Sequence, residues 1–218
     1  MENLNELRKS IDETIVDISE KHRMHRKVQF LLDIRGLLII NKLKASYAEF
    51  GVFRGEMMYA AKEILKDNID KYFGFDTFEG LPAPEGDDAK TFVFEDVGFM
   101  KCPYDEVKEL LGDTPNELIV GDFREEEILS KIDKAIDTIS ILSLDCNWPS
   151  SVEASLDLGA SKLVSGSIVY FDDYFVGMRG GDYTAPLIKQ VEEKYGIKFI
   201  FFKSYAPCAR AFVIEKLS

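Results

Sequence analysis

A long hydrophobic run is missing from this chain. No stretch approaches the ~20 consecutive apolar residues that a membrane-spanning helix needs, and the polar start M-E-N-L-N-E-L lacks the apolar core of a secretory signal peptide. These absences argue against a membrane-spanning protein and against export. We therefore expect a cytoplasmic protein that does not associate with membranes.

Positive charge and cysteine are also scarce. The chain has 27 Lys and Arg against 39 Asp and Glu, a net charge of -12, which argues against nucleic acid and anionic lipid as partners. Three cysteines, Cys102, Cys146 and Cys208, lie far apart and fit no disulfide or zinc framework, so we expect reduced thiols. What is present is 218 residues, 46% of them hydrophobic, which suffices for one domain with a sizeable core.

Short apolar runs alternate with helix-forming segments from Tyr47 onward. Strands are expected at about 46–52, 71–76, 116–121, 138–145 and 167–173, and a closing hairpin at 198–203 and 209–216. Strands separated by single helices predict a parallel sheet with helices on both faces, and the hairpin adds antiparallel strands at one edge. The predicted fold class is α/β, with a mostly parallel, seven-stranded sheet.

Residues 1–45 are expected to form an N-terminal helical extension, ahead of a domain at 46–218. Apolar residues at helical spacing predict a helix over 3–20, and a second, more apolar helix over 28–43 is expected to pack against the domain. The basic run between them, Lys21–Lys27, favours a solvated junction. A patch for an anionic substrate and a metal site on its two histidines, His22 and His25, are the alternatives.

The segment Tyr47–Gly55, Y-A-E-F-G-V-F-R-G, precedes the helix-forming run E-M-M-Y-A-A-K-E-I-L. It predicts a strand, a glycine turn and a helix start, where the backbone can approach a ligand closely. The acid at Glu49 disfavours a phosphate and favours a cationic ligand. The spacing E-x-G-x-x-x-G is not the dinucleotide fingerprint G-x-G-x-x-G; it is similar to motif I of class I S-adenosylmethionine (SAM) methyltransferases. Packing alone is the other explanation of these glycines.

Acidic residues stand at or near the carboxyl ends of five successive strands, the edge where ligands bind in such sheets: Glu49, Asp76, Asp122, Asp145 and the pair Asp172 and Asp173. Asp76 follows F-G-F and suits the two ribose hydroxyls of an adenosine-containing cofactor; a turn cap is the alternative.

Asp145, Asp172 and Asp173 come from two strands that we expect to be neighbours. Three carboxylates at one edge repel each other unless something neutralises them. Oxygen ligands without a nearby His or Cys favour Mg²⁺, Mn²⁺ or Ca²⁺. An acidic rim with raised pKa values is the alternative.

Several segments together resemble the macrocin O-methyltransferase (TylF-type) family: A-E-F-G-V-F-R-G, F-G-F-D-T-F-E-G-L-P, V-G-D-F, and L-S-L-D-C-N with Y-F-D-D-Y. The resemblance covers about residues 36–215. The family consists of SAM- and Mg²⁺-dependent enzymes that methylate hydroxyls, typically of sugars in natural products or in surface glycans such as capsular polysaccharide. The resemblance implies a Rossmann-like class I methyltransferase fold, a small carbohydrate-linked acceptor and self-association, for which the strand Phe199–Phe202 is a candidate edge.

By position, the resemblance also implies a role for each site residue. The cofactor SAM would be bound by Glu49, Gly51, Phe53, Arg54, Gly55, Asp76, Thr77, Phe78, Asp122 and Phe123. Mg²⁺ or Mn²⁺ would be held by Asp145, Asp172 and Asp173, and catalysis would involve Asn147, Asp173 and Asp145. The long loop 82–103, with Phe92, Phe94 and Phe99, is expected to be a lid, and M-R-G-G-D-Y at 178–183 is similar to the family's substrate-side loop.

One departure from the family concerns the general base. The family commonly has an Asp two residues after the first metal ligand, where this chain has Asn147, which cannot accept a proton. The acceptor would then already be anionic, as in a sugar phosphate or phosphoramidate, or the metal alone would activate it, or Asp173, Tyr174 or Asp182 would be the base. A non-catalytic SAM-binding protein and a nicotinamide-dependent oxidoreductase are the alternative functions.

Overall fold

The computed structural model describes residues 4–86, 88, 96–112, 116–175, 183–206 and 208–217, without the side chains of 4–8 and 10–23. The elements in chain order are α1 (Leu4–Asn41), β1 (Ala45–Phe50), α2 (Glu56–Leu65), η1 (Lys66–Asn68), β2 (Ile69–Asp76), α4 (Tyr104–Leu111), β3 (Asn116–Val120), α5 (Glu126–Ala135), β4 (Ile139–Leu144), α6 (Pro149–Ala160), β5 (Leu163–Phe171), α7 (Thr184–Tyr195), β6 (Ile197–Tyr205) and β7 (Ala209–Lys216).

These strands form one seven-stranded sheet in the order β3-β2-β1-β4-β5-β7-β6. The first five strands are parallel, because a helix crosses over between successive strands, and β7 runs antiparallel to β5 and β6. The chain adds strands outward from β1 in one direction and then turns to β4 in the other. The carboxyl ends of β1 and β4 therefore meet at a topological switch point, where such sheets bind ligands.

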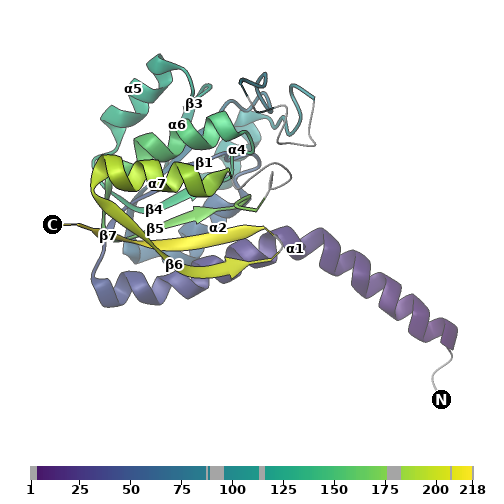
Figure 1. Ribbon diagram of the computed structural model, residues 1–218. Coiled ribbons are helices and arrows are strands. Elements are labelled where there is room, and N and C mark those ends of the chain that lie inside the picture. The colour runs from purple at the N-terminus through teal and green to yellow at the C-terminus, as the bar shows by residue number, and fades with distance from the viewer. Residues whose placement is uncertain are drawn as a thin grey trace.

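Helices cover both faces of the sheet (Figure 1). One core cluster lies between the sheet and α5, α6 and α7, and the other lies between the sheet and α1, α2 and α4. Every residue of β4 is buried, as expected for a central parallel strand that is covered on both sides. The predicted α/β class, the mostly parallel seven-stranded sheet and the C-terminal hairpin are confirmed.

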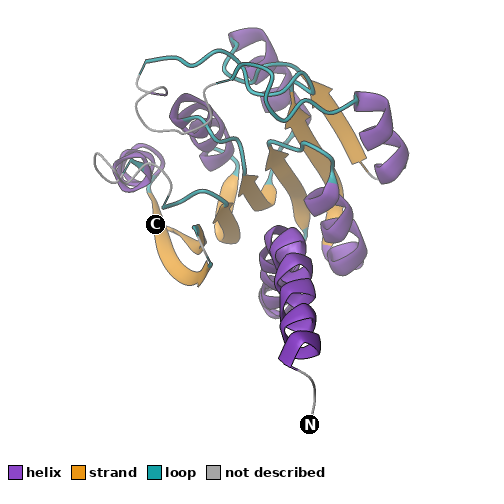
Figure 2. Ribbon diagram, turned by 90° about the vertical axis from the view of Figure 1, so that its right-hand side faces the viewer, coloured by secondary structure: helices purple, strands orange, loops and turns teal. Residues whose placement is uncertain are grey.

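The prediction of two N-terminal helices is wrong, because α1 is one continuous helix of 38 residues. The basic run K-H-R-M-H-R-K contains neither Gly nor Pro, and Lys, Arg and Met are good helix formers, so nothing in it ends a helix. The first half of α1 projects away from the body in Figures 1 and 2. The second half packs on the sheet through Phe30, Leu31, Ile34 and Leu38.

The position of the basic run differs from the solvated junction that we predicted. His25 is exposed, but Arg26 is only partly exposed and Lys27 is buried; the side chain of His22 lies outside the described residues. The division of the chain at residue 45 stays a prediction. Among the described residues, no helix is both long enough and apolar enough to cross a membrane.

Candidate functional site

The turn after β1 is shaped by a close approach of two strand ends. Gly51 has φ +88°, and a Cβ at this position would lie 2.0 Å from the backbone oxygen of Asp145. Gly55 has φ +75°, and its Cβ would lie 2.9 Å from Val107. Packing therefore favours glycine at both positions. Gly51 also lines a cavity.

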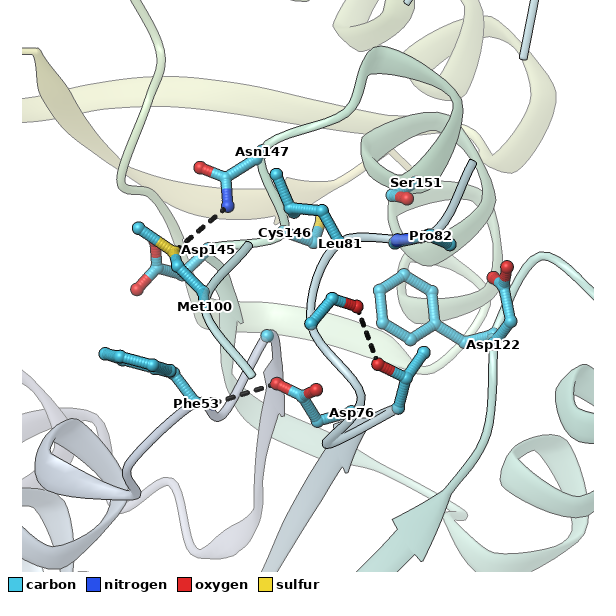
Figure 3. A pocket seen from close by; sticks show the side chains of 14 residues that line it. Phe53, Asp76, Leu81, Pro82, Met100, Asp122, Asp145, Cys146, Asn147 and Ser151 are labelled. Atoms are coloured by element: carbon cyan, nitrogen blue, oxygen red, sulfur yellow. Dashed lines mark hydrogen bonds between the residues drawn. The ribbon is translucent and has the colours of Figure 1, made fainter. Parts of the chain in front are cut away.

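This cavity opens at the carboxyl ends of β1, β2, β3 and β4 (Figure 3). Eight of its lining residues were singled out from the sequence: Gly51, Phe53, Asp76, Thr77, Asp122, Phe123, Asp145 and Asn147. Six were not: Gly80, Leu81, Pro82, Met100, Cys146 and Ser151. Three of these six, Gly80, Leu81 and Pro82, belong to the same D-T-F-E-G-L-P segment as Thr77 and Phe78. The motif could therefore have predicted them as lining residues.

Six other predicted site residues lie outside the cavity lining, namely Glu49, Arg54, Gly55, Phe78, Asp172 and Asp173. The predicted lid loop contributes Met100 to the lining, and Phe99 is 40% exposed. Phe92, Phe94, Asp182 and most of the predicted substrate-side loop lie outside the described residues.

Asp76 joins the turns after β1 and β2. Its Oδ2 accepts a hydrogen bond from the backbone N–H of Phe53, and its Oδ1 accepts one from the N–H of Phe78, both at 2.8 Å. Both phenylalanines have positive φ, +50° and +57°, a conformation that costs a non-glycine residue about 1–2 kcal/mol. Each carboxylate oxygen keeps a further acceptor position, so Asp76 can hold the two turns and a pair of ligand hydroxyls together.

Asp122 is engaged by Arg124, a residue that the sequence did not point to. The guanidinium donates from Nη2 to Oδ2 at 2.7 Å and from Nε to Oδ1 at 3.0 Å, and the Arg124 backbone N–H also donates to Oδ1. Burial opposes ionisation of Asp122, but these hydrogen bonds outweigh it and lower the pKa of the carboxyl. Arg124 also donates to the Ala83 carbonyl and contacts Ser150, so it ties this edge of the cavity to α6.

Asp145, Asp172 and Asp173 do meet, since β4 and β5 are paired neighbours. One oxygen from each lies within 4.8 Å of the others. Two basic residues of α1 form ion pairs with these carboxylates. Lys27 of α1 donates to Asp145 Oδ2, and its Nζ lies 4.0 Å from Asp172 Oδ2.

Arg26 binds the same cluster at Asp172. Its Nε donates to Asp172 Oδ1 at 3.2 Å and its Nη2 donates to Oδ2, while the Tyr170 hydroxyl donates to Oδ1 at 2.8 Å. Burial opposes the charge of Lys27, but the carboxylates of Asp145 and Asp172 raise its pKa, so it is a fixed cation. Burial likewise opposes ionisation of Asp172, and Lys27 and Arg26 lower its pKa nevertheless.

This arrangement bears on the predicted divalent cation. The three carboxylates have the ligand type that Mg²⁺ and Mn²⁺ prefer. However, an ammonium already contacts Asp145 and Asp172, and both oxygens of Asp172 accept hydrogen bonds. The site as built does not fit a divalent ion and Lys27 together. The metal stays a prediction. The helix α1 supplies part of the neutralisation expected of it, but burial and the neighbouring carboxylate of Asp172 still raise the pKa of Asp145 and of Asp173, as the alternative of an acidic rim predicted.

Glu49 precedes the cavity-lining Gly51 by two residues and is 1% exposed. The Tyr47 hydroxyl donates a hydrogen bond to its Oε2. Burial raises the pKa of Glu49 to about 7, although the Tyr47 hydrogen bond and the charge of Lys27 pull it down. An added cation near the turn would favour the ionised form.

We predict that Glu49→Gln stabilises the free protein at alkaline pH. The folded protein holds the Glu49 proton more tightly than the unfolded chain, so the free energy of unfolding falls as pH rises from about 4 to about 7. The pKa difference corresponds to about 3 kcal/mol at most. Urea unfolding at about pH 8 is expected to show Glu49→Gln as the more stable protein, with the gap closing near pH 4.

The control for this prediction is Glu109→Gln, which changes an exposed glutamate. It is expected to follow the wild-type stability curve at every pH. A constant stability difference between Glu49→Gln and wild type across this range would show that Glu49 does not titrate as the burial implies.

Asn147 lies opposite Asp122 across the cavity, beside Asp145 (Figure 3). Its φ is +57°, a backbone conformation that Asn adopts more readily than most residues. The side-chain amide points to Met100 of the lid loop, with Nδ2 3.8 Å from the sulfur. The amide thus lies between Asp145 and the loop residue Met100.

Comparison with known proteins gives a family and a fold. The family model for macrocin-O-methyltransferase (TylF) matches residues 20–183. A search of curated protein sequences finds no match.

Solved structures share the fold at low identity. The O-methyltransferase NovP is 18% identical with a TM-score of 0.69, over 88% of this chain and 80% of that one. The calicheamicin methyltransferase CalS11 is 18% identical with a TM-score of 0.67, over 93% and 85%. The S-adenosylhomocysteine (SAH)-bound Podospora anserina methyltransferase PaMTH1 is 15% identical with a TM-score of 0.51, over 85% and 76%.

Proposed function

This chain belongs to the macrocin-O-methyltransferase (TylF) family and is a SAM-dependent O-methyltransferase, and we propose that it methylates an oxygen of a sugar, a sugar phosphate or phosphoramidate, or a related small metabolite. The observation that carries the proposal is the cavity at the switch point between β1 and β4, with Asp76 and Asn147 in its wall. In this proposal the carboxylate of Asp76 binds the cofactor hydroxyls, and Asn147 faces the methyl acceptor in the same cavity.

In this proposal Asp76 accepts hydrogen bonds from the ribose hydroxyls of SAM, and Asp122 and Phe123 flank the adenine. Gly51 and Phe53 bring the backbone to the methionine end. The negative charge of the buried Glu49 carboxylate favours binding of the positively charged sulfonium of SAM. Arg54, Gly55, Thr77 and Phe78 shape the two turns.

The reaction is an in-line displacement at the methyl carbon. The acceptor oxygen, which is already anionic or gives its proton to a base such as Asp173, forms a bond to that carbon. The carbon–sulfur bond breaks, and its electron pair stays on sulfur as SAH leaves. Holding both reactants in line lowers the barrier by several kcal/mol. Asp145 and Asn147 line the cavity, and in this proposal they orient the attacking oxygen together with Asp173. No step is assigned to Mg²⁺ or Mn²⁺, since Asp145 and Asp172 are ion-paired with α1.

The class of acceptor is supported by one structural neighbour and by Asn147, which cannot take a proton from a neutral hydroxyl. One structure of CalS11 is described as a TDP-rhamnose 3'-O-methyltransferase.

We further propose a setting for this activity. The enzyme works in the cytoplasm, in the synthesis of a natural product or of a surface glycan such as capsular polysaccharide. Its partner is the small acceptor, with no nucleic acid and no membrane. Self-association through the edge strand β6 belongs to the same proposal, because Ile200 and Phe201 on that strand are 45% and 55% exposed.

The test is methyl transfer from labelled SAM to a panel of nucleotide sugars, sugar phosphates, phosphoramidates and matched neutral sugars. We expect methylation of an anionic acceptor and little of its neutral counterpart. Tight SAM binding without turnover on any acceptor would favour the non-catalytic SAM-binding alternative. A parallel titration with NAD tests the oxidoreductase alternative.

Asn147→Asp is expected not to raise turnover on the native acceptor. If the acceptor is already anionic, no base is missing, and a new carboxylate beside Asp145 repels the substrate. The pH–rate profile of the variant should gain no new limb. A large gain in turnover would instead show that the family's base had simply been lost. Asn147→Ala is the control: it removes the amide without adding charge, so it separates repulsion of the acceptor by a new carboxylate from loss of the amide that orients the acceptor.

A further inference from the structure

The three carboxyl groups of the acidic cluster need a cation beside them if all are to be ionised. Asp145, Asp172 and Asp173 present three oxygens within 4.8 Å of one another at the sheet edge. Carboxylates this close repel each other strongly unless a positive charge lies between them. The structure places the ammonium of Lys27 against Asp145 and 4.0 Å from Asp172.

Lys27 has the geometry of a resident cation. Its Nζ contacts Asp145, lies 4.0 Å from Asp172, and belongs to a side chain that is 4% exposed. An ammonium carries three donors on a compact charge, so it can bridge two carboxylates and still present a donor to a third oxygen. It therefore pairs with carboxylates that follow both β4 and β5.

Two features of α1 hold Lys27 in that position. The next turn of the helix buries Phe30 and Leu31, and the Phe30 ring lies 4.4 Å from that of Tyr170. Arg26 takes both oxygens of Asp172, helped by Tyr170. A divalent ion entering this site would have to displace Lys27 and leave a buried ammonium unpaired, which is strongly unfavourable.

We propose that Lys27 replaces the divalent cation at this site, so that the protein binds Mg²⁺ or Mn²⁺ weakly and transfers methyl groups without it. Lys27 is a positioning residue in this scheme: it holds Asp145 and Asp172 at fixed separation and supplies positive charge beside the attacking oxygen. The catalytic part rests on the proposed function, whereas the metal-binding part concerns the protein alone.

The first experiment measures binding of Mn²⁺ alone, by calorimetry and by electron paramagnetic resonance, to the wild type and to Lys27→Met. The wild type is expected to show no binding tighter than about 1 mM, the weak end of oxygen-ligand sites. Lys27→Met exposes the carboxylates and is expected to bind at least tenfold more tightly. Lys44→Met is the matched control, because Lys44 pairs with Asp70 on the exposed surface.

Micromolar Mn²⁺ binding to the wild type, unchanged in Lys27→Met, would overturn the proposal. The wild-type measurement decides the matter even if Lys27→Met does not fold, and Lys27→Arg, which keeps the charge, gives a second variant that should bind Mn²⁺ as weakly as the wild type.

The second experiment measures turnover after exhaustive chelation. Wild-type activity is expected to persist, whereas Lys27→Met should lose about a hundredfold, the typical effect of removing one preorganised charge, and regain part of it with added Mg²⁺. Loss of wild-type turnover on chelation, restored by Mg²⁺, contradicts the proposal. If no acceptor is methylated under any condition, the proposed function fails, and the Mn²⁺ measurement still decides the role of Lys27.

Discussion

Gly51→Ala is expected to destabilise the protein by about 2–5 kcal/mol, a large part of the ~5–15 kcal/mol that holds a typical domain folded. Two effects add. A φ of +88° costs an alanine about 1–2 kcal/mol. The new Cβ would lie 2.0 Å from the backbone oxygen of Asp145, and relieving such an overlap costs about 1–3 kcal/mol. Because the obstacle is backbone, no side chain can rotate away.

The relief of that overlap also damages the site. The turn after β1 and the end of β4 must separate, which breaks the hydrogen bond from the Asp145 N–H to the Phe50 carbonyl at 2.9 Å. We therefore expect Gly51→Ala to lose SAM binding as well as stability. Chemical denaturation and calorimetry measure the two effects.

Gly36→Ala is the matched control. Gly36 lies on the exposed side of α1 with nothing within 4 Å of its Cβ position, so alanine should stabilise the helix by about 1 kcal/mol. A Gly51→Ala protein as stable as the wild type would show that β1 and β4 do not approach as closely as described.

Asp76→Ala is expected to weaken SAM binding by about 1–3 kcal/mol, or about 5- to 150-fold. The substitution removes the proposed acceptor of the ribose hydroxyls. It also frees the backbone N–H groups of Phe53 and Phe78, which hold the two turns in their left-handed conformations. Calorimetric titration with SAM or SAH measures the loss. Asp70→Ala removes an exposed carboxylate from the same strand and should leave affinity unchanged.

A thermodynamic cycle separates the two roles of Asp76. Cofactor analogues that lack a ribose hydroxyl should bind the wild type less tightly than SAH does. If Asp76 accepts from that hydroxyl, the difference between analogue and SAH should disappear in Asp76→Ala. A difference that persists unchanged in the variant would assign Asp76 to the turns alone and refute the ribose contact.

Much of the fold was predictable because its signals are local. Apolar runs of strand length, separated by helix-forming segments, predicted a parallel sheet. The short link between the last two apolar runs predicted the antiparallel pair at the edge, and both were found. The acids at the strand ends followed from the same argument, since the carboxyl ends of parallel strands share one edge.

The cavity was predictable in part for the same reason. Asp76, Asp122 and Asp145 each end a predicted strand, and all three line it. Gly80 and Met100 were missed because they lie in loops. The path of a loop cannot be predicted from hydrophobic periodicity. Glu49 is buried together with its neighbours Tyr47, Ala48 and Phe50, and the surroundings of its carboxylate could not be assigned until the packing on both faces of the strand was known.

The amino-acid sequence by itself determined the α/β sheet and the ring of acids at its edge, because both depend on residue type and spacing along one segment. Only the tertiary structure decided what balances those acids. Lys27 and Arg26 lie more than a hundred residues from Asp145 and Asp172, and in sequence they form part of an ordinary basic run that favours solvent. They reach the acids because α1 continues unbroken through that run and packs on the sheet. Packing of α1 buries the ammonium of Lys27, and a buried ammonium is stable only when a carboxylate pairs with it.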